Sequence, residues 1–302
     1  MKIYSLGLAL SLANLPHIAL ASAQSEAFLS QKSCRNFVRL DEDQVLLGGE
    51  KGLTRIDAAG QTQVYGSEGN PRDAVLVGSK IYALFPSSFV VLDRDSGRVL
   101  ARYATQLYKA PDKLLPQEQA RSLSRSGNRL LIAHGTLGVS VFDLIEQALV
   151  STLDVNRGER LKGMAVDVDF DAAGKVAYVL VDNYQINPIK PSQEFRGILL
   201  YDLQNLRLVK RLLGLDPGAT SFSIERDQML ISFGGMPFWK LQLPLGDQDQ
   251  LADSAQLVWD FGREGHSIGH FASDAEYVWT CHRESSRSPV LPALYTRDQL
   301  GL

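Results

Sequence analysis

The amino-acid sequence predicts an all-β protein built as a single ring of six four-stranded sheets, with seven sheets as the alternative count. Three observations support this prediction. Short runs rich in Val, Ile, Leu, Tyr and Phe alternate with Gly, Asn and Asp turns along the chain. One unit recurs six times at an interval of about 48 residues. No helical period competes except at Pro116–Ser124, where a short helical turn is expected.

The first 23 residues have the features of a secretory signal peptide. Lys2 is followed by the apolar stretch Ile3–Ala13, and Ala21-Ser22-Ala23 fits the small-residue cleavage pattern. Cleavage there predicts a mature chain that begins at Gln24, and residues 24–302 are expected to form the β domain. An uncleaved membrane anchor is the alternative, but the stretch is short for a span. We expect a periplasmic or extracellular protein.

The six repeats share two β-rich runs joined by a variable connection. They are Gln44–Tyr65, Lys80–Tyr103, Arg129–Val155, Val176–Leu213, Gln228–Phe261 and Glu276–Leu300. In the first four, the second run closes on an acidic turn, at Asp57, Asp93, Asp143 and Asp202. An apolar segment precedes most units, such as Asp73–Val77 or Gly163–Val168, and is expected to form an inner strand.

The repeat length and the apolar pattern together predict a β-propeller. An interval of about 48 residues is close to that of a four-stranded propeller blade. In Gly197–Leu203 both alternating faces are largely apolar, which is typical of a sheet covered on two sides. Because a single sheet cannot bury both faces alone, the blades are expected to stack around an axis.

The two ends of the chain are expected to meet in the last blade. The sixth unit lacks an outer strand, and Ala27–Ser33 belongs to no repeat, so we expect this segment to supply that strand. Cys34 and Cys281 are the only cysteines, and they lie near the two ends. An oxidising compartment would allow a disulfide that locks the ring. Two unpaired buried thiols are the alternative.

At the level of its repeats the chain resembles β-propeller proteins of the YVTN and WD-repeat type. In Val258–Cys281, Trp259-Asp260 ends one unit and Gly265-His266 precedes the next, as in WD repeats. Gly163–Asn183 is similar to the start of an NHL-type or YVTN-type blade. The resemblance implies a propeller and mainly a binding role, with enzymes as a minority, so it leaves the function open.

Composition and motifs exclude several functions. A formal net charge of −3 provides no basic field for nucleic acid or anionic lipid. No later segment approaches the ~20 apolar residues that a membrane span requires. The sequence also lacks a phosphate-binding glycine loop, a haem-attachment CxxCH and a GxSxG nucleophile motif. We therefore predict no cofactor, although calcium is kept as a minor alternative.

A polar group near the last repeat is a weak candidate for a metal or ligand site. Its members are His266, His270, Asp274 and His282. Imidazole suits zinc, copper or iron, but residues 266 and 270 would lie about 13 Å apart on an extended strand. A structural WD-type histidine is the simpler interpretation of His266. Cys281 and His282 point to opposite faces of a strand, so they do not suggest a nucleophile and its base.

A calcium site of the kind found in six-bladed lactonases and gluconolactonases is a second alternative. These enzymes hold calcium at the axis through Glu, Asn and Asp, and the sequence resembles them only at Glu68, with Asn183 and Asp274 as later ligands. Glu68-Gly69-Asn70-Pro71 is more simply a turn.

Two long connections, Tyr103–Asn128 and Val181–Gly197, are candidate recognition loops. The second contains Tyr184, Ile186 and Phe195, an apolar set that would suit a protein partner. The alternative is that these residues cover the end of a blade. The leading hypothesis is an exported binding or assembly scaffold without catalysis. The competing hypothesis is a metal-dependent lactonase or hydrolase with a divalent ion in the central channel.

Overall fold

The structure is a computed structural model of the 302-residue chain. It describes residues 23–31, 34, 36–41, 44–49, 52–65, 71–107, 109–155, 163–171, 173–183, 196–215, 219–225, 227–233, 236–243, 256–259, 267–273, 276–283, 291–300 and 302.

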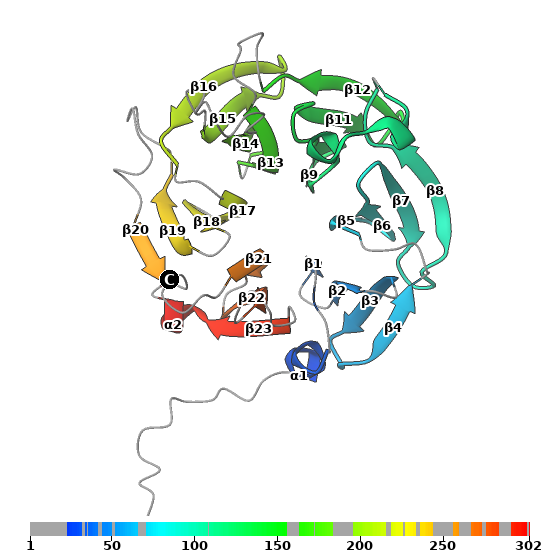
Figure 1. The fold of residues 1–302 in the computed structure, drawn as a ribbon. Coiled ribbons are helices and arrows are strands. Elements are labelled where there is room, and N and C mark those ends of the chain that lie inside the picture. The colour runs from blue at the N-terminus through cyan, green and yellow to red at the C-terminus, as the bar shows by residue number, and fades with distance from the viewer. Residues whose placement is uncertain are drawn as a thin grey trace, which may run out of the picture.

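Six antiparallel sheets are arranged as blades around a common axis (Figure 1). Blade 1 consists of β1 (Asn36–Asp41), β2 (Gln44–Gly49), β3 (Gly52–Asp57) and β4 (Thr62–Tyr65). Blade 2 consists of β5 (Asp73–Val77), β6 (Lys80–Leu84), β7 (Ser88–Asp93) and β8 (Val99–Ala104). Blade 3 consists of β9 (Ser122–Ser126), β10 (Arg129–Ala133), β11 (Val139–Asp143) and β12 (Ala148–Leu153). Blade 4 consists of β13 (Gly163–Phe170), β14 (Val176–Asn183), β15 (Gly197–Asp202) and β16 (Arg207–Leu213). Blade 5 consists of β17 (Ala219–Glu225), β18 (Gln228–Phe233), β19 (Met236–Gln242) and β20 (Gln256–Trp259). Blade 6 consists of β21 (Ser267–Ser273), β22 (Tyr277–Arg283) and β23 (Leu291–Thr296).

In every blade the strands pair in chain order, so each blade is a meander. The first strand of each blade lies nearest the axis, and the fourth strand, where present, lies at the rim (Figure 1). The predicted propeller and its six blades are confirmed. The expected inner strand Asp73–Val77 is β5, and Gly163–Val168 lies within β13. In the described part of the chain the sixth blade has three strands rather than the expected four.

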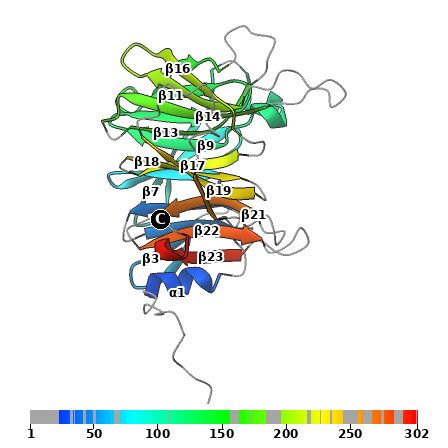
Figure 2. The same cartoon turned by 90° about the vertical axis from the view of Figure 1, so that its left-hand side faces the viewer.

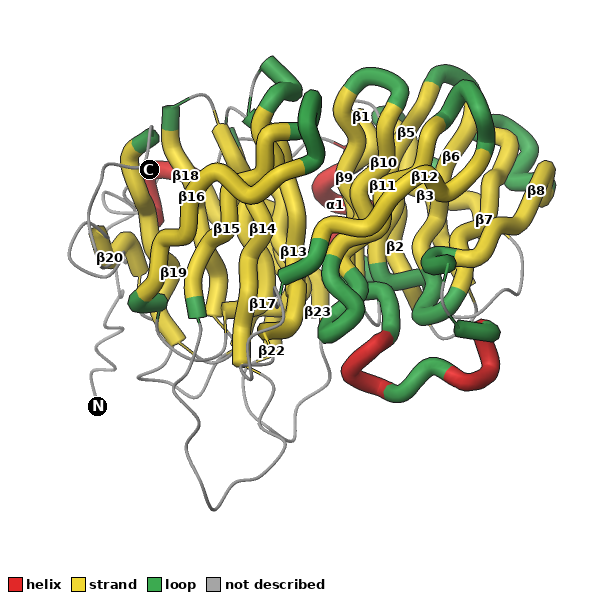
Figure 3. The backbone as a smooth tube through the Cα atoms, turned by 90° about the horizontal axis from the view of Figure 1, so that it is seen from above, coloured by secondary structure: helices red, strands yellow, loops and turns green. Residues whose placement is uncertain are grey.

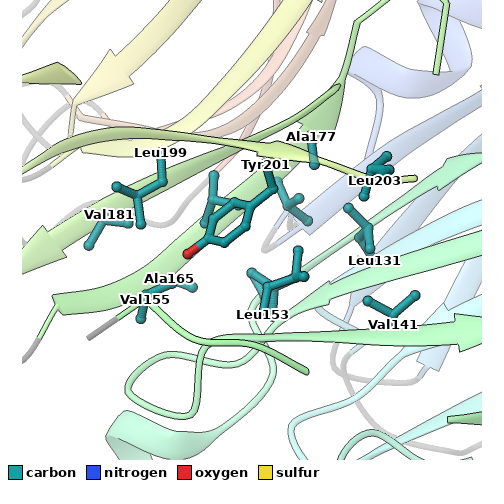
Figure 4. Packing of buried hydrophobic residues seen from close by; sticks show 14 of the residues in the cluster. Leu131, Val141, Leu153, Val155, Ala165, Ala177, Val181, Leu199, Tyr201 and Leu203 are labelled. Carbon is teal, nitrogen blue, oxygen red and sulfur yellow. The ribbon is translucent and has the colours of Figure 1, made fainter. Parts of the chain in front are cut away.

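The buried apolar residues form six clusters, one at each junction between neighbouring blades. Between blades 3 and 4, Leu131 and Leu153 face Leu199 and Tyr201 (Figure 4). Tyr201 also donates a hydrogen bond from its hydroxyl to the Asp154 carbonyl at 2.6 Å. Ile198, next to Leu199 on β15, packs instead with blade 5. This alternation confirms that both faces of the strand are covered.

Four blades carry an Asp at the end of the third strand because its carboxylate accepts hydrogen bonds from turn amides, as at Asp57, Asp143 and Asp202. Asp93 Oδ1 accepts hydrogen bonds from the Ser96 amide at 2.9 Å and from the Ser96 hydroxyl at 2.6 Å. Gly97 follows with a φ of +68°, and a Cβ there would lie 2.2 Å from the Tyr65 ring. The turn therefore depends on a carboxylate that caps free amides and on a glycine that tolerates a positive φ.

The ring closes differently from the prediction that Ala27–Ser33 forms a strand. Ala23–Leu29 is the helix α1, which lies beside β23 and β3 at the junction of blades 6 and 1 (Figure 2). Phe28 is fully buried and packs edge-on against Trp279, with the ring centroids 5.1 Å apart. A helix was not foreseen because a seven-residue helix is too short to show a hydrophobic period.

The Cys34–Cys281 disulfide joins the two ends of the chain at the same junction, and both cysteines are fully buried. The last strand leads into α2 (Arg297–Leu300), and Arg297 Nη1 lies 2.7 Å from Glu225 Oε2 of blade 5. Among the described residues, blades 6 and 1 are joined by α1, the disulfide and apolar side-chain contacts, and no strand of one pairs with a strand of the other. No helix in the described part of the chain is long and apolar enough to cross a membrane.

Candidate functional site

The strand order places the long connections on one face of the ring, which we call the loop face. In a meander blade, the inner strand starts at the face where the second strand ends. Both the links between blades and the hairpins from second to third strand therefore lie on this face. The β8–β9 connection is such a link, and β14 ends and β15 begins on this face. The short helical turns of the β8–β9 connection project beyond the strand ends at the lower edge of Figure 3.

The β8–β9 connection, residues 105–121, is tightly held against the blades. It contains the 3₁₀ turns η2 (Pro111–Lys113) and η3 (Pro116–Glu118), the second of which starts where a helical turn was expected. Glu118 accepts a hydrogen bond from the Leu115 amide at 3.0 Å and forms an ion pair with Lys109. Interactions within the segment therefore stabilise its conformation.

Contacts with two hairpins fix this segment on the loop face. The Ala120 amide donates to the Pro86 carbonyl at 2.8 Å, between β6 and β7. The Thr136 amide donates to the Gln117 carbonyl at 2.9 Å, between β10 and β11. At Gly135 a Cβ would lie 1.9 Å from that same carbonyl, so only glycine allows this approach.

His134 anchors the segment from below. The ring is fully buried, and its Nδ1 donates to the Glu118 carbonyl at 3.0 Å. Burial lowers the pKa of His134, and the positive charge of Arg72 lowers it further, against the effect of the backbone carbonyls that the ring faces. A neutral histidine is therefore part of the support for the segment.

The outer side of the segment exposes two large apolar side chains. Leu107 is 54% exposed and Leu115 is 50% exposed, and Lys113 and Pro116 are exposed between and beside them. Exposing leucine on a segment that is held this firmly has no benefit for folding, because burial of a leucine is favourable by about 2 kcal/mol. An ordered segment with exposed apolar side chains is suited to binding another molecule.

Two arginines lie at the start of neighbouring inner strands on the same face. Arg72 immediately precedes β5 and Arg121 immediately precedes β9, and each is half-buried. Burial lowers the pKa of both guanidinium groups, and the charge of Arg121 adds to this effect at Arg72. The loop face thus has a concentration of positive charge beside the 105–121 segment.

Three aspartates link the inner strands near the axis. Asp73 Oδ2 accepts from the Leu123 amide of blade 3 at 2.7 Å. Asp167 Oδ2 accepts from the Ser221 hydroxyl and the Phe222 amide of blade 5, each at 2.9 Å. Asp169 also bridges to blade 5 and accepts from Ser124 of blade 3. These carboxylates connect blades 2 to 5, which gives them a structural role.

Burial and mutual repulsion set the charge of these aspartates. Burial is the main effect and raises the pKa of Asp73 to about 8 and that of Asp169 to about 6. Burial also raises the pKa of Asp167. The charges of Asp167 and Asp169 raise the pKa of Asp73 further. Burial therefore disfavours the charged form of all three carboxyl groups.

Most of the predicted site residues lie outside the described residues or have only their backbone described. Glu68, Tyr184, Ile186, Phe195, His266 and Asp274 belong to the first group. Asn183 is at the end of β14, His270 lies at a register shift in β21, and His282 follows Cys281 in β22. Among the residues that the structure describes, no three His, Cys, Asp or Glu side chains are grouped to hold a metal.

Sequence reasoning named the 103–128 connection as a recognition loop but missed its particular residues. It also missed Arg72 and Arg121. A signal for the arginines was available, because they are about one repeat interval apart and each precedes an inner strand. The axial aspartates gave no clear signal, since isolated Asp residues in apolar runs resemble turn residues.

The sequence matches no family model and no curated protein. The fold is similar to solved β-propellers. The β-propeller domain of Cps50 (Swd1) from Myceliophteria thermophila matches with a TM-score of 0.59 and 12% identity, over 88% of this chain and 86% of that one. The Neurospora crassa Pan2 WD40 domain matches with a TM-score of 0.54 and 14% identity, over 83% and 72% of the two chains.

A third similar structure is the extracellular domain of a B. thetaiotaomicron protein described as a hybrid two-component system. Its TM-score is 0.56 at 13% identity, over 89% of this chain and 34% of that one. At these identities the comparisons define a class of fold. The protein has a WD-repeat-like β-propeller fold.

Proposed function

We propose that this protein is an exported β-propeller scaffold that binds another protein through the loop face of its ring. The observation that carries this proposal is the 105–121 segment, which is fastened to two hairpins and yet exposes Leu107 and Leu115. A surface that is already ordered loses little conformational entropy when a partner binds. The predicted partner loop Val181–Gly197 lies outside the described residues over 184–195, which include Tyr184, Ile186 and Phe195.

Three features support export. The first 23 residues fit a signal peptide, a disulfide joins the two ends, and one similar propeller is an extracellular domain. The lactonase alternative has no comparable support, because the described carboxylates near the axis bind amides and hydroxyls of neighbouring blades.

Site-specific photocrosslinking in the organism that produces the protein tests the proposal. A photoreactive amino acid replaces Lys113, which is exposed and lies between the two leucines in the sequence. The control replaces Val209, which is 61% exposed on β16 at the rim. We expect one discrete crosslinked protein from position 113 and none from position 209.

The apolar contact is tested by adding Leu107→Ser or Leu115→Ser to the position-113 probe. Each change should reduce the crosslink at least fivefold, whereas Val209→Ser should leave it unchanged. Equal crosslinking at positions 113 and 209, or crosslinking that is insensitive to both leucine changes, would contradict a binding role for this surface.

A further inference from the structure

Arg72 and Arg121 occupy equivalent places in blades 2 and 3. The Arg72 amide donates to the Leu84 carbonyl at 2.7 Å, at the end of β6. The Arg121 amide donates to the Ala133 carbonyl at 2.8 Å, at the end of β10. Because the two strand pairs have the same geometry, the two side chains start from neighbouring positions on the loop face, near the axis.

The Arg72 guanidinium is held in place by neutral groups. Nη1 donates to the Ala120 carbonyl at 2.8 Å, and Nη2 donates to Gln119 Oε1 at 2.6 Å. Both acceptors belong to the 105–121 segment, so Arg72 fixes that segment and brings a positive charge beneath it. Neither acceptor carries the negative charge that would compensate a half-buried cation.

The Arg121 guanidinium is less satisfied still. Its Nε is shielded from solvent and has no hydrogen-bond partner. Asp182 is the acidic group that acts on Arg121, and this carboxylate lies 3.2 Å from Arg196 Nε in an ion pair of its own. Within the described part of the chain, no ion pair joins Arg72 or Arg121 to a carboxylate.

Arg72 and Arg121 repel each other, and Asp182, the acidic group that acts on Arg121, is already paired with Arg196. Partial burial removes water from each guanidinium, and their mutual repulsion adds to the cost. A guanidinium whose donors are unused is a ready fork for a carboxylate, which it binds through two parallel hydrogen bonds. Both terminal nitrogens of Arg72 already donate hydrogen bonds, so Arg72 would attract a carboxylate through its charge alone. Arg121 would donate the two parallel hydrogen bonds to that carboxylate.

We infer that Arg72 and Arg121 form a carboxylate-binding site on the loop face, which receives an Asp or Glu side chain of the protein partner. This inference rests on the proposed function and adds the chemistry of the partner: an acidic residue beside apolar residues. The acidic residue would contact Arg121, while the apolar residues would cover Leu107 and Leu115 of the adjoining segment.

Selection from a random peptide library displayed on phage, with the purified protein as bait, tests the inference. The selected peptides are synthesised, and their dissociation constants are measured for wild type, Arg121→Met, Arg72→Met and the control Arg125→Met. Arg125 lies on the same strand as the site, is exposed, and donates to the Gly127 carbonyl at the far end of β9.

We expect peptides that combine an acidic residue with apolar residues. Binding should weaken at least tenfold in Arg121→Met and in Arg72→Met, and it should be unchanged in Arg125→Met. Arg121→Lys should retain part of the affinity, because it keeps the charge and loses the fork. Arg121→Met should unfold at the same temperature as wild type or higher, because it removes an uncompensated charge.

Three results would overturn the inference. The first is selected peptides without acidic residues, or binding that does not depend on Arg121. The second is binding of free succinate to Arg121 with no Arg121-dependent peptide, which would assign the site to a small carboxylate. The third is a lower unfolding temperature for Arg121→Met, which would make Arg121 structural. The crosslink at position 113 is measured separately. If the carboxylate-binding inference fails, the protein-binding proposal is therefore still judged by that crosslink.

Discussion

Loss of the Cys34–Cys281 disulfide should destabilise the whole ring. The two cysteines are 247 residues apart in sequence, and their Cα atoms are 5.4 Å apart. The chain runs on from blade to blade at every other junction, whereas in the described residues blades 6 and 1 are joined by α1, side-chain contacts and this bond. The disulfide therefore restricts the unfolded chain over nearly its whole length.

The magnitude follows from the entropy of closing so long a loop. In the chain-entropy model, a loop of this size contributes roughly 5 kcal/mol to the free energy of unfolding at 25 °C, as an upper figure. For a domain of this size, about 2 °C of unfolding temperature corresponds to each kcal/mol. We therefore expect the midpoint of thermal unfolding to fall by roughly 10 °C.

The measurement compares thermal unfolding of the oxidised protein, the reduced protein and the Cys34→Ala/Cys281→Ala variant. Free thiols are titrated in the unfolded samples to establish that reduction is complete. The double variant with and without reductant is the control, and its midpoint should not respond to reductant. A fully reduced wild-type protein that unfolds within about 2 °C of the oxidised form would refute the reasoning, because it would show that the ring is closed by noncovalent contacts alone.

Two further predictions concern the same ring. Phe28→Ala should lower the free energy of unfolding by about 3–5 kcal/mol, because it leaves a cavity against Trp279, whereas Leu29→Ala, at a residue 44% exposed, should change it by less than about 0.5 kcal/mol in urea denaturation. Stability should also depend on Asp73, whose pKa burial raises to about 8. Its contribution is complete below the unfolded pKa of about 4 and is lost as the pH rises toward 8. The free energy of unfolding of Asp73→Asn should therefore fall less than that of wild type between pH 5 and pH 8, because this range lies within the interval between the two pKa values. Parallel curves for the two proteins would contradict this effect.

The sequence was sufficient to predict the repeated blade. The apolar runs with period two and the Asp at the third-strand turn are local properties of one unit. The repeat interval is read directly from the spacing of these units along the chain. For this reason β5 was placed at its observed bounds, Asp73–Val77, and the alternation in Gly197–Leu203 was predicted correctly. The pairing of Cys34 with Cys281 was also accessible, because only two cysteines exist and they lie near the two ends.

The mode of closure and the candidate site depended on the tertiary structure. Whether Ala23–Leu29 becomes a helix or a strand is decided by the packing of Phe28 against residues of blades 6 and 1, and Phe28 and Trp279 are more than 200 positions apart. The same is true of Arg72 and Arg121, whose mutual repulsion and lack of a direct ion pair in the described residues arise from the stacking of two blades. Local sequence determined the blades. The junction of blades 6 and 1 and the arginine pair on the loop face depend on residues that only the folded ring brings together, because burial and electrostatic interaction depend on distance in space.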